Sequence, residues 1–288
     1  MRKNQFIEKV IHGIFLLLGL ITVGCVLLIT VYLVISGIPA IREIGLVDFL
    51  FGHEWASTAA NPKYGILPFI LTSVYGTAGA IAIGVPIGFM TAVYLSKLAS
   101  PKVKSVMQSA VSLLAGIPSV VYGLVGMLVL VPGIRKLFSV PDGASLLAAI
   151  IVLAIMILPS IIKMSITALD AVPKEYEDAS LALGATPVET YFRVSVPAAK
   201  SGIAAAVVLG VGRAIGEAMA VMMVAGNAAN MPNSIFQSVR FLTTAVSSEI
   251  SYSGGLQRQA LFSIALVLFL FIMLINAALN FFLKREKE

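Results

Sequence analysis

The chain has 288 residues, of which 59% are hydrophobic and 12% charged, and its mean hydropathy is +0.99. This composition excludes an ordinary soluble domain and indicates an integral membrane protein. The formal charge of +6 does not indicate nucleic-acid binding, because basic residues of membrane proteins gather in cytoplasmic loops.

The chain begins with a short basic segment, 1–12, followed by a long uncharged apolar run from Gly13. This run is too long for a signal-peptide core and lacks an evident cleavage site, so we expect a retained transmembrane helix. Its cysteine, Cys25, is the only one in the chain and allows no internal disulfide. The next loop, 42–63, mixes charges with aromatic residues that suit a membrane interface.

Further apolar runs predict an all-α polytopic membrane protein with six transmembrane helices. We expect one transmembrane domain, 13–283, with a short tail, 284–288, and spans at about 13–37, 67–96, 105–131, 143–162, 201–227 and 260–283. Pro118 is expected to kink the third span, and the carbonyl groups that a kink frees must be satisfied by neighbours or water.

The basic residues are unevenly distributed over the loops that six spans create. Thirteen Lys and Arg residues lie on the side of both termini and six on the other side, with Arg213 inside the fifth span. Because positive residues are retained on the cytoplasmic side, we expect both termini in the cytoplasm.

The longest polar connection, within 163–200, carries charges of both signs and helix-forming residues, which predicts an ordered helical hairpin. Gly184 suits a left-handed helix stop. Thr186 is expected to cap a second helix, with Pro187 at its first position and Glu189 completing the cap. The small residues before the turn, Ala179 and Ser180 among them, would let a partner's groove close around the first helix.

The fifth span contains two opposite charges, Arg213 and Glu217. Residues four apart on a helix share one face, so we expect these side chains to pair and to face protein or water. A lone charge at the centre of a membrane helix costs at least about 2.5–3.5 kcal/mol, which makes a lipid-facing position improbable. The pair has two interpretations, a substrate path and a structural lock between helices.

Two stretches resemble the permease subunits of ABC importers. Asp178, Ala179, Ser180 and Gly184 stand in the register of the family's coupling loop, Glu-Ala-Ala, three residues, then Gly, with Asp for Glu and Ser for the second Ala. The stretch 212–227 is similar to the PstC-type permeases of phosphate-specific importers, as are 61–70 and 116–123. The companion PstA-type permeases resemble the chain less, because they differ after Gly216-Glu217.

The resemblance implies a type I, MetI-like permease fold in the plasma membrane of a bacterium or archaeon. It implies import of phosphate by a heterodimer with a PstA-type permease, driven by a PstB-type ATPase dimer and supplied by a PstS-type binding protein. A phosphate-sensing kinase is a further partner that the family implies. In this picture Arg213 meets the passing phosphate, Glu217 holds Arg213 when phosphate is absent, and residues 178–180 with Gly184 couple to the ATPase. No enzyme activity, cofactor or metal is expected, since the chain has no phosphate-binding loop of its own.

Three alternatives remain beside this interpretation. A permease of the same family could carry another oxyanion or another solute. A secondary transporter would also tolerate intramembrane charges, but such proteins typically contain internal repeats, and the long polar hairpin argues against one. A membrane enzyme would need several reactive groups converging at one depth, where this sequence offers only Arg213 and Glu217.

Overall fold

The computed structural model describes the backbone of residues 2–285, and it describes side chains from residue 8 to residue 281 except 9, 279 and 280. The predicted segment 1–12 and tail 284–288 therefore lie partly outside the described residues. The longer helices are α1 (Arg2–Ile44), α3 (Leu67–Val93), α4 (Pro101–Gly116), α7 (Leu146–Asp170), α11 (Lys200–Gly216) and α14 (Gly255–Arg285). The shorter ones are α2 (Leu46–Phe51), α5 (Ser119–Val125), α6 (Val131–Phe138), α8 (Lys174–Ala182), α9 (Pro187–Thr190), α10 (Val196–Ala198), α12 (Met219–Val224) and α13 (Leu242–Glu249).

The predicted fold class is confirmed. Five helical segments are long and apolar enough to cross a membrane, and a sixth span results if the bent pair Pro187–Ala198 and Lys200–Gly216, which meet at 71°, is one span. The five are Val10–Ile44, Leu67–Leu98, Ser119–Phe138, Leu146–Asp170 and Gly255–Ala278. Three segments are π-helical, η1 (Tyr94–Leu98), η2 (Gly126–Leu130) and η3 (Tyr191–Ser195). A short antiparallel hairpin joins two strands of two residues each, β1 (Trp55–Ala56) and β2 (Lys63–Tyr64).

The third predicted span, 105–131, is not one helix. Helix α4 ends at Gly116, Ile117 adopts an extended conformation with φ −71° and ψ 127°, and a new helical segment begins at Ser119 and runs to Phe138. Proline disfavours helical conformation in the residue before it and lacks an N–H group, which explains why the chain breaks before Pro118 rather than merely bending. The break shifts the span toward residue 138, so Arg135 and Lys136, expected in a loop, lie in the last turn of α6.

The fourth predicted span, 143–162, also has different bounds. Helix α7 begins after Ser145, whose hydroxyl oxygen accepts a hydrogen bond from the backbone N–H of Ala148 at 3.4 Å. The helix continues through Lys163 to Asp170. Because the long lysine side chain reaches outward while its backbone stays helical, Lys163 is exposed and does not end the helix.

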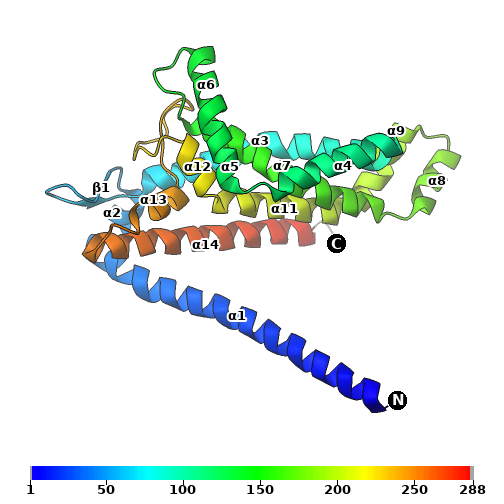
Figure 1. The fold of residues 1–288 in the computed structure, drawn as a ribbon, viewed down its shortest axis with the longest axis horizontal. Coiled ribbons are helices and arrows are strands. Elements are labelled where there is room, and N and C mark those ends of the chain that lie inside the picture. Colours follow the sequence, from blue (N-terminus) through cyan, green and yellow to red (C-terminus); the bar gives the residue numbers. More distant parts are fainter. Residues whose placement is uncertain (1, 286–288) are drawn as a thin grey trace.

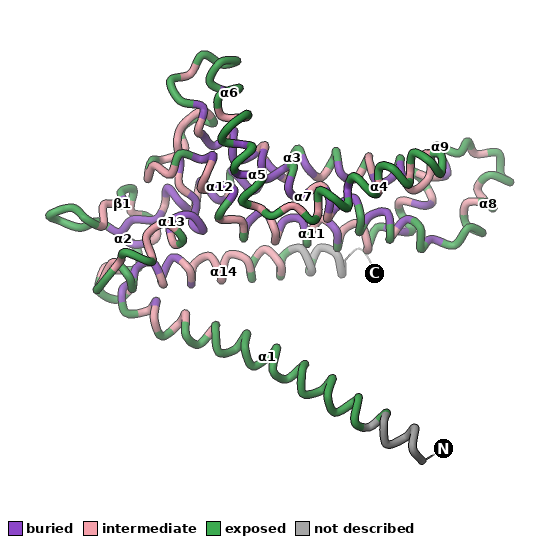
Figure 2. The backbone as a smooth tube through the Cα atoms, viewed as in Figure 1, coloured by how far each residue is buried: buried purple, intermediate pink, exposed green. Residues whose placement is uncertain are grey.

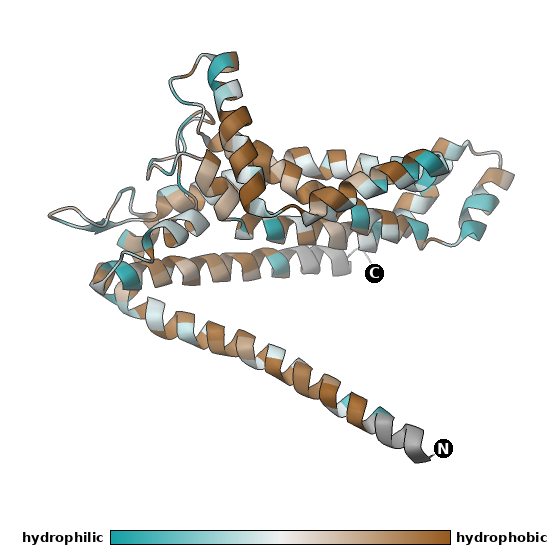
Figure 3. Ribbon diagram, viewed as in Figure 1, coloured by the Kyte–Doolittle hydropathy of each residue, from teal (hydrophilic) through white to brown (hydrophobic). Residues whose placement is uncertain are grey.

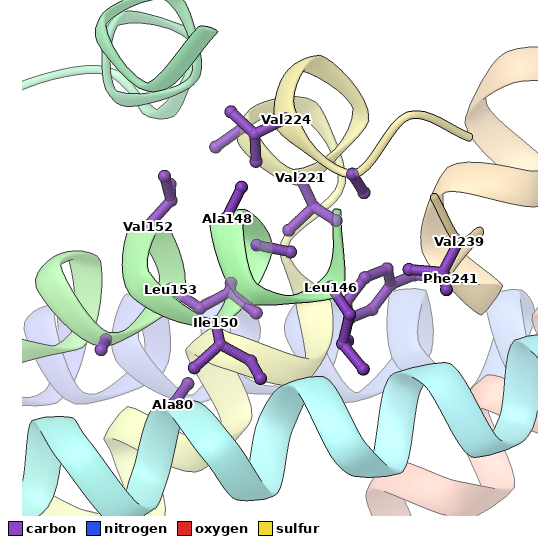
Figure 4. Close-up of a cluster of buried hydrophobic side chains, with 14 of the residues drawn as sticks. Ala80, Leu146, Ala148, Ile150, Val152, Leu153, Val221, Val224, Val239 and Phe241 are labelled. Carbon is purple, nitrogen blue, oxygen red and sulfur yellow. The ribbon is translucent and has the colours of Figure 1, made fainter. Parts of the chain in front are cut away.

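The core lies around α7. This helix packs against α3 on one side and against α11 and α12 on the others, and its residues are the most buried of the candidate spans (Figure 2). Figure 4 shows side chains of α7, such as Leu146 and Leu153, between Ala80 of α3 and Val221 of α12. Phe241, which follows the long loop after α12, closes one end of this cluster (Figure 4).

Helix α1 meets α14 only near its C-terminal end. The hydroxyl of Ser263 donates to the carbonyl oxygen of Gly37 at 2.5 Å, and the rings of Tyr32 and Phe262 meet edge to face with centroids 5.5 Å apart. Toward its N-terminus α1 diverges from the rest of the chain (Figure 1). Its surface there is exposed and apolar (Figures 2 and 3), as expected of a helix that faces lipid or another membrane protein.

The molecule has two distinct ends in Figure 1. We call the end that carries α8 and α9 the hairpin end, and the end that carries β1, α2 and α13 the strand end. Helices α1 and α14 meet at the strand end, and their outer termini point toward the hairpin end (Figure 1). This arrangement places the outer ends of α1 and α14 on the side of the hairpin, as an even number of spans requires.

Candidate functional site

The two charges that the sequence placed on one helix face are separated by a helix break. Helix α11 ends at Gly216, Glu217 is extended with φ −74° and ψ 127°, and α12 starts at Met219. No ion pair joins Arg213 to Glu217 among the described side chains, so the expected pairing is wrong. The four-residue spacing brings side chains together only where the helix continues, and here it does not.

Glu217 instead organises the start of α12. Its carboxylate oxygen Oε1 accepts a hydrogen bond from the backbone N–H of Ala220 at 2.9 Å, which satisfies one of the free donors at a helix N-terminus. Its carbonyl oxygen accepts from the hydroxyl of Thr243 in α13 at 2.8 Å. One N–H group and one carbonyl group at the break are thus satisfied within the chain, as a break at membrane depth requires of its backbone groups.

Arg213 is left without a carboxylate partner among the side chains that the structure describes. Its Nη1 lies 3.4 Å from the hydroxyl oxygen of Ser160 in α7, a long hydrogen bond. Arg213 also lines an open cavity of about 690 Å³ between α7, α11 and α14. The cavity's other lining residues are apolar or small, apart from Asn276: Met164, Ala205, Val208, Leu209 and Gly212. Arg213 therefore has N–H donors available for an anion in apolar surroundings.

A second break lies beside the first. Between α4 and α5, the carbonyl oxygen of Leu114 accepts a hydrogen bond from the hydroxyl of Tyr122 at 2.7 Å. The expectation that Pro118 frees a carbonyl which a neighbour satisfies is therefore confirmed. Helix α5 then packs closely on α12, where a side-chain carbon added at Gly123 would lie 2.9 Å from the Cα of Ala220. The helical segments that follow the two breaks, α5 and α12, are thus in contact with each other.

The predicted hairpin is present at the opposite end of α11, with the local geometry that its sequence indicates. Gly184 has φ +87°, the left-handed conformation that ends a helix. Thr186 and Glu189 form a reciprocal capping box, with Pro187 at the first helical position. The hydrogen bonds from Thr186 hold the pKa of the Glu189 carboxyl below its ordinary value.

The residues predicted to couple to an ATPase lie on this hairpin. Asp178, Ala179 and Gly184 are exposed, and Ser180 is half-buried. The hydroxyl oxygens of Ser180 and Thr190 lie 2.9 Å apart, so Ser180 ties α8 to α9. Asp178 and Ala179 remain open to contact from outside the chain.

Sequence reasoning missed two polar clusters that lie outside the expected site. At the hairpin end, Glu177 pairs with Lys97 of η1. At the strand end, Glu249 of α13 accepts from Arg240 and from the indole N–H of Trp55. Arg240 also donates to the carbonyl oxygen of Asn227, just after α12. The interacting residues in the cluster around Glu249 lie between 9 and 194 positions apart in the sequence. Such separations follow no regular spacing from which the contacts could be predicted.

No metal-binding group of three or more His, Cys, Asp or Glu side chains occurs in the part of the chain that the structure describes. Cys25 is exposed on α1. The site thus combines Arg213 in α11, beside a largely apolar cavity, with Glu217 at the helix break that follows.

Comparison with known proteins gives concordant results. Residues 84–287 match the family described as binding-protein-dependent transport system inner membrane component. The probable ABC transporter permease protein YqgH of Bacillus subtilis is 41% identical over 266 residues, which cover 90% of this chain and 86% of that protein. The phosphate transport system permease protein PstC of Haemophilus influenzae is 35% identical over 278 residues, covering 89% and 86%.

Solved structures show the same fold. A chain of the inward-facing MetNI methionine ABC transporter matches with a TM-score of 0.57 and 20% identity, covering 77% of this chain and 94% of that one. A chain of a bacterial alginate ABC transporter matches with a TM-score of 0.61 and 14% identity, covering 93% and 92%. At these identities the likeness concerns the fold alone, which is that of the MetI-type importer permeases.

Proposed function

The chain belongs to the family of binding-protein-dependent transport system inner membrane components, and from that membership we propose that it is the permease subunit through which an ABC importer moves inorganic phosphate into the cell. Members of the family are multi-pass inner membrane proteins and the permease component of an ABC transporter, not its catalytic subunit. ATP hydrolysis and substrate capture accordingly fall to partner subunits, an ATPase and a binding protein.

The observation that carries the substrate class is Arg213. Arg213 lies near the end of α11, in the sixth candidate span, where it lines an open cavity and has no carboxylate partner among the described side chains; such a guanidinium favours an anionic substrate. Its planar fork matches two oxygens of a phosphate, and it remains charged in apolar surroundings. Relatives named as phosphate transport permeases support phosphate as that anion.

The weak contact from Ser160 bears on release as well as binding. Transport requires a site that attracts the ion and then lets it leave. A neutral hydroxyl at 3.4 Å orients the guanidinium without neutralising it, so phosphate does not have to displace a carboxylate on entry. Release of phosphate would then depend on movement of α11, the helix that carries Arg213. The hairpin precedes α11 in the chain, so movement of the hairpin would move this helix.

The proposed partners follow from the same reasoning. A related PstA-type permease would complete the path, and a PstB-type ATPase dimer would contact Asp178 and Ala179, which are exposed on the hairpin. A PstS-type binding protein would deliver phosphate at the strand end. No residue in this chain points to a contact with a phosphate-sensing kinase.

The proposed substrate is tested with the assembled complex in proteoliposomes, by measuring ATP-dependent uptake of radiolabelled phosphate in competition with other solutes. We expect arsenate, which has the same shape and charge, to compete, and sulfate and methylphosphonate to compete at least about tenfold less well, because each lacks one of the groups that phosphate offers. Uptake of sulfate or an organic solute in place of phosphate would assign the chain to another substrate of the family. Uptake driven by an ion gradient without ATP would indicate a secondary transporter.

The proposed orientation places the strand end outside the cell and the hairpin in the cytoplasm. In a Cys25→Ser background, single cysteines at Ala59 and Ser247, both exposed at the strand end, should react with a membrane-impermeant thiol reagent in intact cells. A cysteine at Leu183, 89% exposed on the hairpin, should react only after permeabilisation. The reverse pattern would overturn the orientation and, with it, the direction of transport.

A further inference from the structure

The carboxylate of Glu177 joins three segments at the hairpin end. Its Oε1 forms an ion pair with the ammonium group of Lys97 at 2.6 Å and accepts a hydrogen bond from the hydroxyl of Ser195 at 2.8 Å. Glu177 lies in α8, Lys97 in η1 at the end of α3, and Ser195 in η3 just before α11. One oxygen atom therefore connects the hairpin's outer helix to the bases of two long helices.

This connection is enclosed. The side chains of Lys97 and Glu177 are only 11% and 17% exposed, and Ser195 is fully buried. A second ion pair nearby, Lys104 with Asp170, is much more open, at 31% and 43%. Water screens exposed pairs, so they contribute little, whereas removal of one partner from an enclosed pair leaves an uncompensated charge.

Few other contacts hold α8 to the rest of the chain. Helix α8 has no buried residue, so apolar packing does not fix its position. Besides the bridge through Glu177, the described side-chain contacts of α8 include the Ser180–Thr190 hydroxyl pair, which stays within the hairpin. Apart from the chain connections of α8 to α7 and α9, the side chain of Glu177 therefore provides the link from α8 to η1 at the end of α3 and to η3 before α11.

Both segments that Glu177 contacts are π-helical turns. Segment η1 follows α3 directly, and η3 leads through α10 into the 71° bend before α11. The wider turn of a π-helix interrupts the regular hydrogen-bond ladder, and such turns are frequent at functional sites. Helix α11 carries Arg213 near its other end. The three segments form a continuous physical link from the exposed hairpin to the cavity.

We propose that Glu177 is the positioning residue through which movement of α8 is transmitted to α3 and α11. The proposal rests on the proposed function insofar as it takes the exposed hairpin to be the surface on which the ATPase acts. Glu177 itself does not contact the ATPase or the substrate. It keeps α8, α3 and α11 moving together, so that ATP binding on one side changes the cavity at Arg213.

The test uses a reporter that needs no phosphate. Leu209 lines the Arg213 cavity and is 52% exposed, so a cysteine there, in the Cys25→Ser background, reports on the cavity through its rate of labelling. The assembled complex is compared before and after incubation with ATP and vanadate, which traps ADP and vanadate on the ATPase after one hydrolysis step. We expect trapping to change the labelling rate in the otherwise unaltered complex.

Glu177→Gln should reduce the trapping-dependent change in labelling rate by about fivefold or more, an effect of the size that coupling mutations produce. The ATPase should still copurify with this variant. Ser195→Ala should reduce the change in labelling rate less, and the exchange of charges Lys97→Glu with Glu177→Lys should restore part of it. The matched control is Asp170→Asn, which weakens the open pair with Lys104 and the hydrogen bond from the hydroxyl of Ser96 at the same end, and which should leave the change in labelling rate nearly intact.

An undiminished response in Glu177→Gln would overturn the proposal, as would an equal loss in Asp170→Asn. Absence of any ATP-dependent change in the unaltered complex would also overturn it, because nothing would then be transmitted to α11. Failure of phosphate uptake alone, with the labelling response present, would count against the proposed substrate and leave this inference standing. If Glu177→Gln fails to assemble, Ser195→Ala with the same reporter decides, since it removes only a hydroxyl group.

Discussion

Replacing Gly123 with leucine should abolish transport and sharply reduce the amount of assembled complex. A Cβ atom at this position would lie 2.9 Å from the Cα and 3.2 Å from the carbonyl oxygen of Ala220, and 2.8 Å from the sulfur of Met223. The methionine side chain can move, but the backbone of α12 cannot without displacing the capped break at Glu217. Overpacking of this kind typically lowers the free energy of unfolding by about 1–3 kcal/mol. Because the added side chain would meet backbone atoms, we expect a loss near the upper limit of this range.

The matched control is Gly133→Leu, in α6 of the same candidate span. A Cβ atom there meets nothing within 4 Å, so the substitution should leave the thermal stability of the purified complex close to that of the unaltered protein. Thermal unfolding and radiolabelled phosphate uptake are measured for both variants. If Gly123→Leu retains both stability and uptake, the close contact of α5 with α12 has no part in the working transporter.

Local signals made the hairpin predictable. Its turn and second helix depend on Gly184, Thr186, Pro187 and Glu189, which interact within six residues of one another. Each of these residue types has a backbone preference or a short-range hydrogen bond that decides its conformation. The same holds for the break near Pro118, which the sequence located although it indicated a kink rather than a full break.

The break after Gly216 could not be predicted in this way. No proline marks it, and hydrophobic periodicity continues through the stretch 212–227 as though it were one helix. The carbonyl oxygen of the extended Glu217 accepts a hydrogen bond from Thr243, which lies 26 residues farther along the chain. The prediction that Arg213 and Glu217 form a pair assumed an unbroken helix. The helix is broken between them, at a position where Glu217 makes a long-range hydrogen bond.

The contacts of Glu177 and Glu249 illustrate the same limit at longer range. Lys97 and Glu177 lie in different segments 80 positions apart, and Glu249 meets Trp55 across 194 positions. In the sequence alone, these residues are isolated charges in polar segments, and such charges are usually exposed to solvent. Only the packing of the helices shows that these charges are enclosed and therefore consequential.

Arg213→Gln should reduce phosphate uptake to background while the complex still assembles. Each charge-assisted hydrogen bond is worth about 1.5–3 kcal/mol, and loss of even one such bond in the path lowers the rate or affinity by about tenfold or more. Glutamine keeps a polar group near Ser160, so the fold is spared. Arg213→Lys should retain part of the activity, because it keeps the charge and loses the planar fork.

The same account predicts that Glu217→Gln does not rescue Arg213→Gln. If the two residues were a structural pair, removal of both charges would be tolerated better than removal of one. Since no ion pair joins them in the described structure, the double variant should behave like Arg213→Gln alone. Glu217→Gln by itself should have a mild effect, because an amide oxygen can still accept from the N–H of Ala220.

The central claim is that Arg213 meets the transported anion, and its most direct test is radiolabelled phosphate uptake per assembled complex in the Arg213→Gln, Glu217→Gln double variant. Assembly is quantified by copurification of the ATPase, so that a loss of uptake is not confused with a loss of protein. We predict normal assembly with uptake at background. Uptake near that of the unaltered complex would contradict the account and leave Arg213 as a charge that serves packing alone.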